Sequence, residues 1–145
     1  MGQITASWQA WALLAAGFAA ATAILAKVGV EGVASDYATF LRTLVVLAML
    51  AAILLLTGEM RSPRGIPTRS AVFLVLSGLA TGASWLCYFR ALKLGQASQV
   101  APIDKLSVVL VAVFGALFLG ERLSATGWLG VGLIGLGAWL VARPG

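Results

Sequence analysis

Three charged side chains interrupt long apolar stretches of this sequence and are the first candidates for chemistry. Arg42 lies inside an apolar run at 36–57, and Asp104 and Lys105 lie inside another at 98–119. A charge in an apolar layer needs an opposite charge or a water-filled cavity. Arg42 and Asp104 lie about 9–10 Å from the same side of that layer, and a carboxylate can accept a bidentate contact from arginine. We therefore expect the two to form a pair.

Two interpretations of the Asp104-Lys105 dipeptide remain open. If Asp104 pairs with Arg42, Lys105 needs another acidic partner. Glu31 and Asp36 lie at a similar depth and are the candidates. Alternatively, Asp104 favours the start of a helix whose first turn contains Pro102. Lys105 would then lie near the membrane interface and extend its ammonium into water.

Aromatic residues supply the second half of the candidate site. Thr81, Trp85 and Tyr88 follow an i, i+4, i+7 spacing that places them on one face of a helix. An aromatic wall beside a cation is typical of a polar binding cavity, although Trp and Tyr in helices also serve simply as packing residues. The candidate substrate-binding residues are Arg42, Thr81, Trp85, Tyr88, Asp104 and Lys105. The cations at this level, which are Lys27, Arg42, Arg90 and Lys105, outnumber Asp104 and favour an anionic or zwitterionic substrate.

Residue types needed for catalysis or metal binding are scarce. The sequence has no His and one Cys, which excludes a His/Cys metal cluster and a Ser/His/Asp set. Cys87 lies in an apolar run and is interpreted as a small packing residue. We expect no enzyme activity, no metal and no cofactor.

Long apolar helices must position these residues. The chain has 145 residues, 61% hydrophobic and 10% charged, with a mean hydropathy of +1.00. Soluble domains carry about 45–50% apolar and about 25% charged residues, and a chain this short has too little interior to bury the excess. Such an apolar composition also excludes disorder. The net charge of +5 comes from residues at the ends of the apolar runs, so we expect no nucleic-acid partner.

Five stretches are long enough to cross a bilayer core, which takes about 20 apolar residues in a helix. They are 9–30, 36–57, 70–93, 98–119 and 125–142, separated by a polar loop at 58–69 and by short breaks at 32–35, 94–97 and 120–124. The expected fold class is an all-α integral membrane protein with five transmembrane helices in a single domain over 1–145. Trp8, Trp11, Tyr37, Trp128 and Trp139 fit interfacial positions, and the glycines of 125–142 predict close helix packing.

The distribution of basic residues bears on orientation. An odd number of spans places the two termini on opposite sides of the membrane. The N-terminal side holds Arg61, Arg64, Arg69 and Arg122, and the other side holds Lys27, Arg90, Lys93 and Arg143. Because Lys/Arg asymmetry sets orientation, this balance predicts dual topology, with a single orientation fixed by finer details as the alternative.

A set of short motifs resembles one family. The motifs are Ala91-Leu92-Lys93 through Ala97, Ala101-Pro102, Leu119-Gly120-Glu121-Arg122-Leu123, Trp128-Leu129-Gly130 and Gly137, with Lys27 and Arg42 as basic residues of the first two helices. Over nearly its whole length the chain is similar to one EamA repeat of the drug/metabolite transporter superfamily. Residues 102–107 depart from the family pattern, which has apolar or small residues there, so no relative's substrate is carried over.

The resemblance implies a small-molecule transporter or exporter of the bacterial inner membrane. Typical members have two five-helix repeats of opposite topology around a central cavity, whereas this sequence has one repeat. An antiparallel homodimer with alternating access would rebuild that arrangement. Two alternatives remain: a flippase for lipid-linked headgroups, and a non-transporting scaffold or regulatory subunit in which Arg42, Asp104 and Lys105 satisfy one another.

Overall fold

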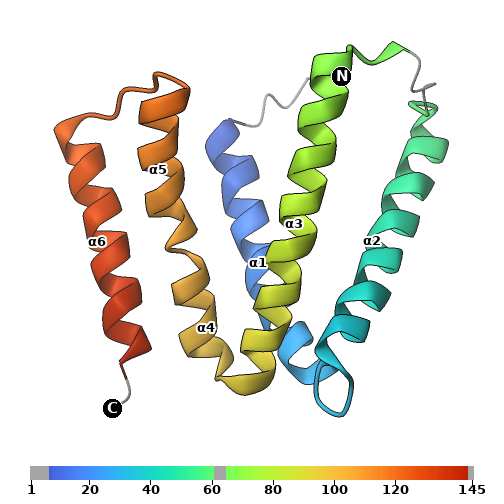
Figure 1. The fold of residues 1–145 in the computed structure, drawn as a ribbon, viewed down its shortest axis with the longest axis horizontal. Helices are drawn as coiled ribbons and strands as arrows, with labels where there is room; N and C mark the ends of the chain where they lie inside the picture. The colour runs from blue at the N-terminus through green and yellow to red at the C-terminus, as the bar shows by residue number, and fades with distance from the viewer. Residues whose placement is uncertain (1–6, 61–64, 144–145) are drawn as a thin grey trace. The chain divides into compact units, whose positions relative to one another are not determined.

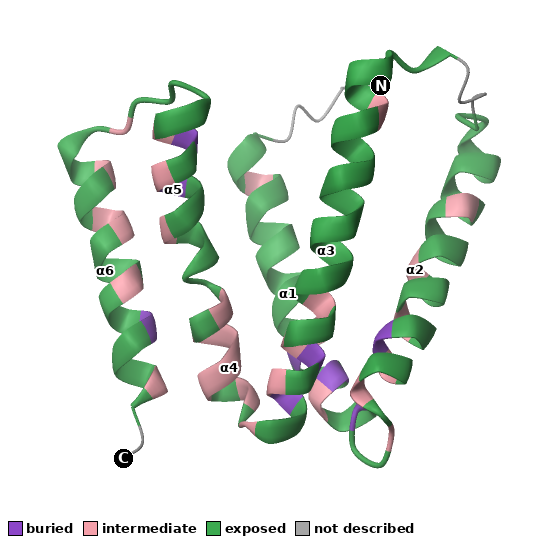
Figure 2. Cartoon of the chain, viewed as in Figure 1, coloured by how far each residue is buried: buried purple, intermediate pink, exposed green. Residues whose placement is uncertain are grey.

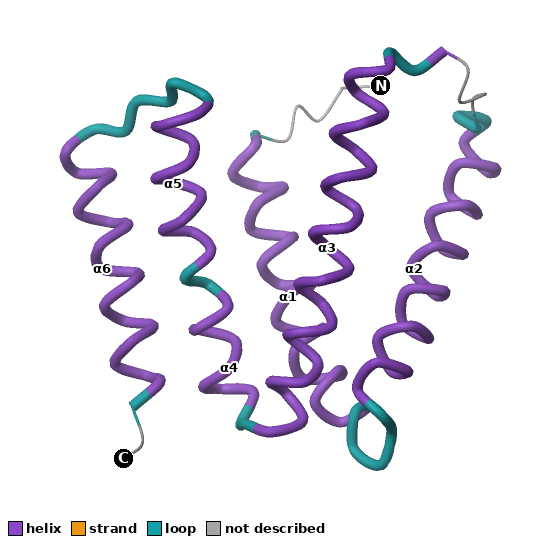
Figure 3. Tube along the Cα trace, viewed as in Figure 1, coloured by secondary structure: helices purple, strands orange, loops and turns teal. Residues whose placement is uncertain are grey.

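The described part of the chain consists of helices joined by turns and loops (Figures 1 and 3). The computed structural model describes residues 7–60 and 65–143, and within these ranges it contains no strand. The helices are α1 (Trp8–Gly29), α2 (Ser35–Thr57), α3 (Thr68–Leu94), α4 (Ala97–Asp104), α5 (Ser107–Phe118) and α6 (Ala125–Ala142). Five segments are long and apolar enough to span a membrane, with α4 and α5 together forming the fourth. The predicted fold class is therefore confirmed, and the predicted span ends are within two residues of the helix ends.

The fourth span differs from its prediction because it is two helices rather than one. The chain tightens between Pro102 and Leu106, where the Lys105 amide donates to the Pro102 carbonyl at 3.1 Å and the Leu106 amide to the Ile103 carbonyl at 2.9 Å. These i→i+3 bonds are the pattern of a 3₁₀ turn, which often marks an interruption in an α-helix. The missing N–H of Pro102 removes a bond to the Ser98 carbonyl. Because Ser98 lies before the break, the proline weakens α4 but does not itself end it.

The described helices fall into two compact units. The first comprises residues 1–26 and 94–145, and the second comprises 27–93. In the first unit, α4 and α5 both pack against α6. A Cβ added at Gly135 of α6 would lie 3.3 Å from Cγ2 of Val109 in α5. The small residue lets these two helices approach closely, as the glycine content of α6 predicted.

Turns end the helices where the sequence placed the breaks. Gly120, with φ +68°, follows α5 in the left-handed region that suits glycine. The Gly115 carbonyl accepts the amides of Leu119 and Glu121 at 3.1 Å each. The Glu121 carboxylate lies so close that a Cβ on Gly115 would be 2.7 Å from Oε2. Glu121 is exposed but folded back onto α5. Ser124 then caps α6 by accepting the Gly127 amide at 3.1 Å.

Most of the described residues in the single chain are exposed, as the colouring of Figure 2 shows, and they include many large apolar residues. Within each candidate span only 6–11% of the residues in the most apolar window are buried. An exposed apolar surface of this extent is unstable in water but is what lipid tails cover. Four of the five aromatic residues predicted at the interface exceed 45% exposure, and Trp128 is at 40%. These side chains are therefore available to the lipid and its headgroups.

Candidate functional site

Arg42 is packed against aromatic rings. Its guanidinium carbon lies over the Trp85 ring, 4.0 Å from the centroid, and 5.6 Å from the centroid of Phe89. Phe89 is buried, and Arg42 and Trp85 are half-buried. Tyr88 is close enough to interact electrostatically with the guanidinium. The structure thus brings together three of the predicted site residues: Arg42, Trp85 and Tyr88.

Helix geometry explains why Arg42 and Trp85 meet. At 1.5 Å per residue, Arg42 lies about 10 Å along α2 from Ser35. Trp85 lies about 13 Å along α3 from Leu94. The two helices run in opposite directions between these ends, so the side chains are at similar depth. A cation over an aromatic face gains roughly 0.5–2 kcal/mol, more as it is desolvated, and this attraction offsets part of the cost of placing the guanidinium within the apolar layer.

Thr81 continues the face of α3 that carries Trp85. Its Oγ1 donates to the Ser77 carbonyl at 2.9 Å, and the residue is exposed. The hydroxyl therefore donates its hydrogen bond within its own helix, and its oxygen can still accept one. No contact between Thr81 and the Arg42 cluster is present among the described side chains, and the part it plays in binding stays a prediction.

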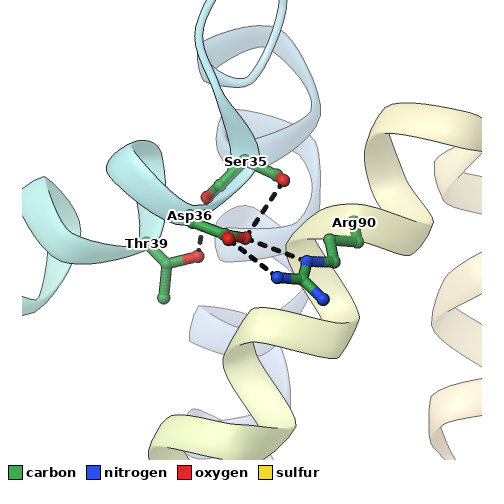
Figure 4. A network of polar contacts seen from close by, with 4 residues as sticks. All are labelled: Ser35, Asp36, Thr39 and Arg90. Carbon is green, nitrogen blue, oxygen red and sulfur yellow. Dashed lines mark hydrogen bonds and ion pairs between the residues drawn. The ribbon is translucent and has the colours of Figure 1, made fainter.

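A bidentate ion pair links the start of α2 to the end of α3 (Figure 4). Arg90 donates through Nε to Asp36 Oδ1 at 2.9 Å and through its second terminal nitrogen to Oδ2 at 2.7 Å. Ser35 adds a hydrogen bond to Oδ1 at 3.3 Å, and Thr39 donates to the Ser35 carbonyl at 2.9 Å. Asp36 is therefore occupied by Arg90, which corrects the expectation that Lys105 would look to it for a partner.

Two lysines hold backbone carbonyls in the same unit. Lys27 Nζ donates to the Leu92 carbonyl at 2.7 Å, and Lys93 Nζ donates to the Val33 carbonyl at 2.8 Å. Leu92 is among the last residues of α3, where carbonyls lack a partner in the helix. A cation there satisfies the carbonyl and favours the helix dipole. Lys27 thus has a structural role that its place in the cation count did not predict.

Asp104 and Lys105 lie at the interruption between α4 and α5. They form an ion pair at 3.2 Å, with 36% and 55% of their side chains exposed. Asp104 is the last residue of α4, and Pro102 is well inside that helix, so the alternative of a helix starting near Pro102 is wrong. Asp104 and Arg42 belong to different units, and the expected pair between them stays a prediction.

Comparison with known proteins identifies the family. The family model described as "EamA-like transporter family" matches residues 6–143. A curated protein of Sinorhizobium sp., described as an uncharacterized transporter in the cobO 3′ region, is 62% identical over 136 residues, covering 94% of this chain and 96% of that protein. No solved structure matches significantly. With five apolar spans in the structure, the chain is an integral membrane transporter rather than an enzyme, and it belongs to the EamA-like transporter family.

Proposed function

We propose that this transporter moves a small molecule across the bacterial inner membrane as an antiparallel homodimer with alternating access. The observation that carries the proposal is the Arg42 guanidinium held about 10 Å inside an apolar span against Trp85. Ionised groups at such a depth are rare, and they mark substrate and ion pathways in membrane proteins. The proposed binding residues are Arg42, Thr81, Trp85 and Tyr88, with Asp104 and Lys105 from the interrupted span.

The number of spans supports the proposed homodimer. Five spans make one repeat, and transporters of this kind place their site between two repeats of opposite orientation. The relative from Sinorhizobium is also almost covered by this one repeat. A second, inverted copy would supply the missing wall of the cavity and cover part of the exposed apolar surface. The balanced Lys/Arg distribution supports insertion in both orientations.

A reporter experiment tests the orientation. Reporters fused to the C-terminus, one active only inside and one only outside the cell, are both expected to be active at similar levels. Replacing Arg69 with Gln removes one charge from the N-terminal side and is expected to shift the ratio of the two reporters. Activity on one side alone would contradict the antiparallel assembly.

A ligand screen followed by flux measurement tests transport. Purified protein is screened for thermal stabilisation by metabolites and cationic drugs, and each hit is measured by counterflow in proteoliposomes. Trp85→Ala is expected to abolish both the stabilisation and the counterflow, because it removes the platform of Arg42. Trp139→Ala is the matched control, because Trp139 also lies under an arginine, with the Arg143 guanidinium carbon 3.6 Å from its ring centroid. Equal loss in both variants would contradict the proposed site.

A further inference from the structure

We infer that the substrate carries an oxyanion, above all a carboxylate, and that Arg42 binds it through its N–H groups. The inference rests on the proposed function and names the substrate class. It depends on which charges at the level of the site are already neutralised in the described structure, and on what surrounds the guanidinium.

The sequence places three other cations, Lys27, Arg90 and Lys105, at the depth of Arg42, and each of them already has a partner in the structure. Lys27 donates to the Leu92 carbonyl, Arg90 pairs with Asp36, and Lys105 pairs with Asp104. The positive layer expected from the sequence is therefore reduced to Arg42. A free anion would have to displace an existing partner from any of the other three.

The guanidinium of Arg42 differs because its neighbours are aromatic. Among the described residues of 27–93, it contacts the rings of Trp85 and Phe89 and has no hydrogen-bond acceptor. An aromatic ring interacts with the charge of the guanidinium and accepts no strong hydrogen bond from it. Arginine presents five N–H donors in a fixed fork that matches a carboxylate in two-point contact. The cluster therefore holds the charge in place and leaves its donors for a ligand.

The acidic residues argue against a cationic substrate. Asp36 is held by Arg90 in two hydrogen bonds, and Asp104 has Lys105 beside it. A cation bound by either carboxylate would have to displace the partner that this carboxylate already has, and a cation bound beside Trp85 would face the positive charge of Arg42. The remaining described acidic residues, Glu31, Glu59 and Glu121, lie outside the helices. The site thus carries one uncompensated positive charge in each protomer.

Trp85 can report on the binding directly. In a variant with Trp8, Trp11, Trp128 and Trp139 replaced by Phe, Trp85 is the only remaining tryptophan. The protein is placed in nanodiscs of phosphatidylcholine and titrated with phenylacetate, its neutral isostere phenylacetamide, and phenethylammonium. Phenylacetate is expected to change the Trp85 emission saturably, at least about tenfold more tightly than the amide. Phenethylammonium is expected to have no effect.

Substitutions at Arg42 assign the response. Arg42→Gln is expected to abolish the preference for phenylacetate over phenylacetamide, and Arg42→Lys is expected to retain it in weakened form, because lysine keeps the charge but loses the fork. Arg69→Lys is the control matched to Arg42→Lys, because it keeps the charge that bears on orientation. Arg69 also lies over an aromatic ring, 6.0 Å from that of Phe73, but at the start of α3. The same probes are also tested for thermal stabilisation of the protein that keeps all five tryptophans. This second measurement repeats the comparison without the four Phe substitutions.

The outcomes separate the inference from the proposed function. Equal binding of acid and amide, or no response to any probe in either measurement, overturns the inference. Arg42-dependent binding of phenylacetate without counterflow supports the inference and counts against transport. Counterflow that ignores ligand charge leaves transport standing and overturns the oxyanion site. Nanodiscs containing phosphatidylglycerol identify the source of the anion, because an Arg42-dependent change on adding this lipid alone assigns the site to a lipid phosphate.

Discussion

The basic side chains of residues 27–93 make two different kinds of contact. Arg90 and Lys27 bond to groups on neighbouring segments and hold the helix ends together, whereas Arg42 rests on aromatic rings. The distinction lies in the partner: a carboxylate or carbonyl uses the donors of a cation, and a ring leaves them available. Residue type and depth alone placed all three in one layer, and only the contacts separate them.

The pair between Asp36 and Arg90 is expected to behave as a single unit in mutagenesis. Asp36→Asn and Arg90→Gln should each lower the thermal stability of the purified protein, because each leaves the opposite charge without its bidentate partner. The double variant should be no less stable than the poorer single variant, because the interaction is already lost. Additive losses would mean that each residue has a more important partner elsewhere.

Removal of the Lys27 ammonium is expected to lower the free energy of unfolding by about 1–3 kcal/mol, the usual cost of leaving a buried hydrogen-bonding group without its partner. The reason is that Lys27→Met leaves the Leu92 carbonyl, in a buried residue, without its donor. Lys93→Met is the matched control, because Lys93 is exposed and its bond reaches a loop carbonyl. Denaturant titration should show the larger loss for Lys27→Met, and the reverse order would refute the capping role.

Among the elements, hydropathy and turn residues were enough to predict all five spans, with ends displaced by two residues or fewer. The break in the fourth span was missed because an average over side chains carries no information on backbone bonding. The contact of Arg42 with Trp85 could be anticipated from matching depth.

The same reasoning could have predicted the pair between Asp36 and Arg90, because the start of α2 and the end of α3 lie on the same side of the membrane. The lysine-to-carbonyl bonds have no comparable signal, because every residue carries a carbonyl.

The break is expected to survive removal of the proline. Pro102→Ala restores an N–H for the Ser98 carbonyl and should strengthen α4, but the tight bonds at Lys105 and Leu106 lie beyond it. Hydrogen exchange measured by residue should show added protection within α4 and little change at 105–107. A uniform gain of protection across 97–118 would show instead that Pro102 causes the interruption.

Two glycines are expected to respond in opposite ways to alanine. Gly120 has φ +68°, so Gly120→Ala should cost about 1 kcal/mol or more of stability. Gly130 is helical and its added Cβ would meet open space in the single chain. In monomeric protein, Gly130→Ala should therefore be neutral or stabilising by up to about 1 kcal/mol. Chemical denaturation of both variants measures the difference, and similar losses would contradict it.

At the scale of the whole molecule, the proposed antiparallel dimer makes a prediction about accessibility. In a Cys87→Ser background, Gly65→Cys marks the loop before α3 and Gln96→Cys marks the turn before α4, at the opposite ends of α3. Each is expected to react with a membrane-impermeant maleimide in about half of the molecules in intact cells, because the proposed dimer needs both orientations in the membrane. Complete labelling at one position and none at the other would exclude dual insertion.

The hydrogen bond from Lys27 to the Leu92 carbonyl also has a consequence for biogenesis. The two residues are 65 positions apart, so the first helix leaves the ribosome long before the carbonyl that its lysine will bind has been synthesised. This hydrogen bond therefore cannot influence how the first two helices enter the membrane. It forms only after the third helix has been synthesised, and from then on it joins the end of the first helix to the end of the third.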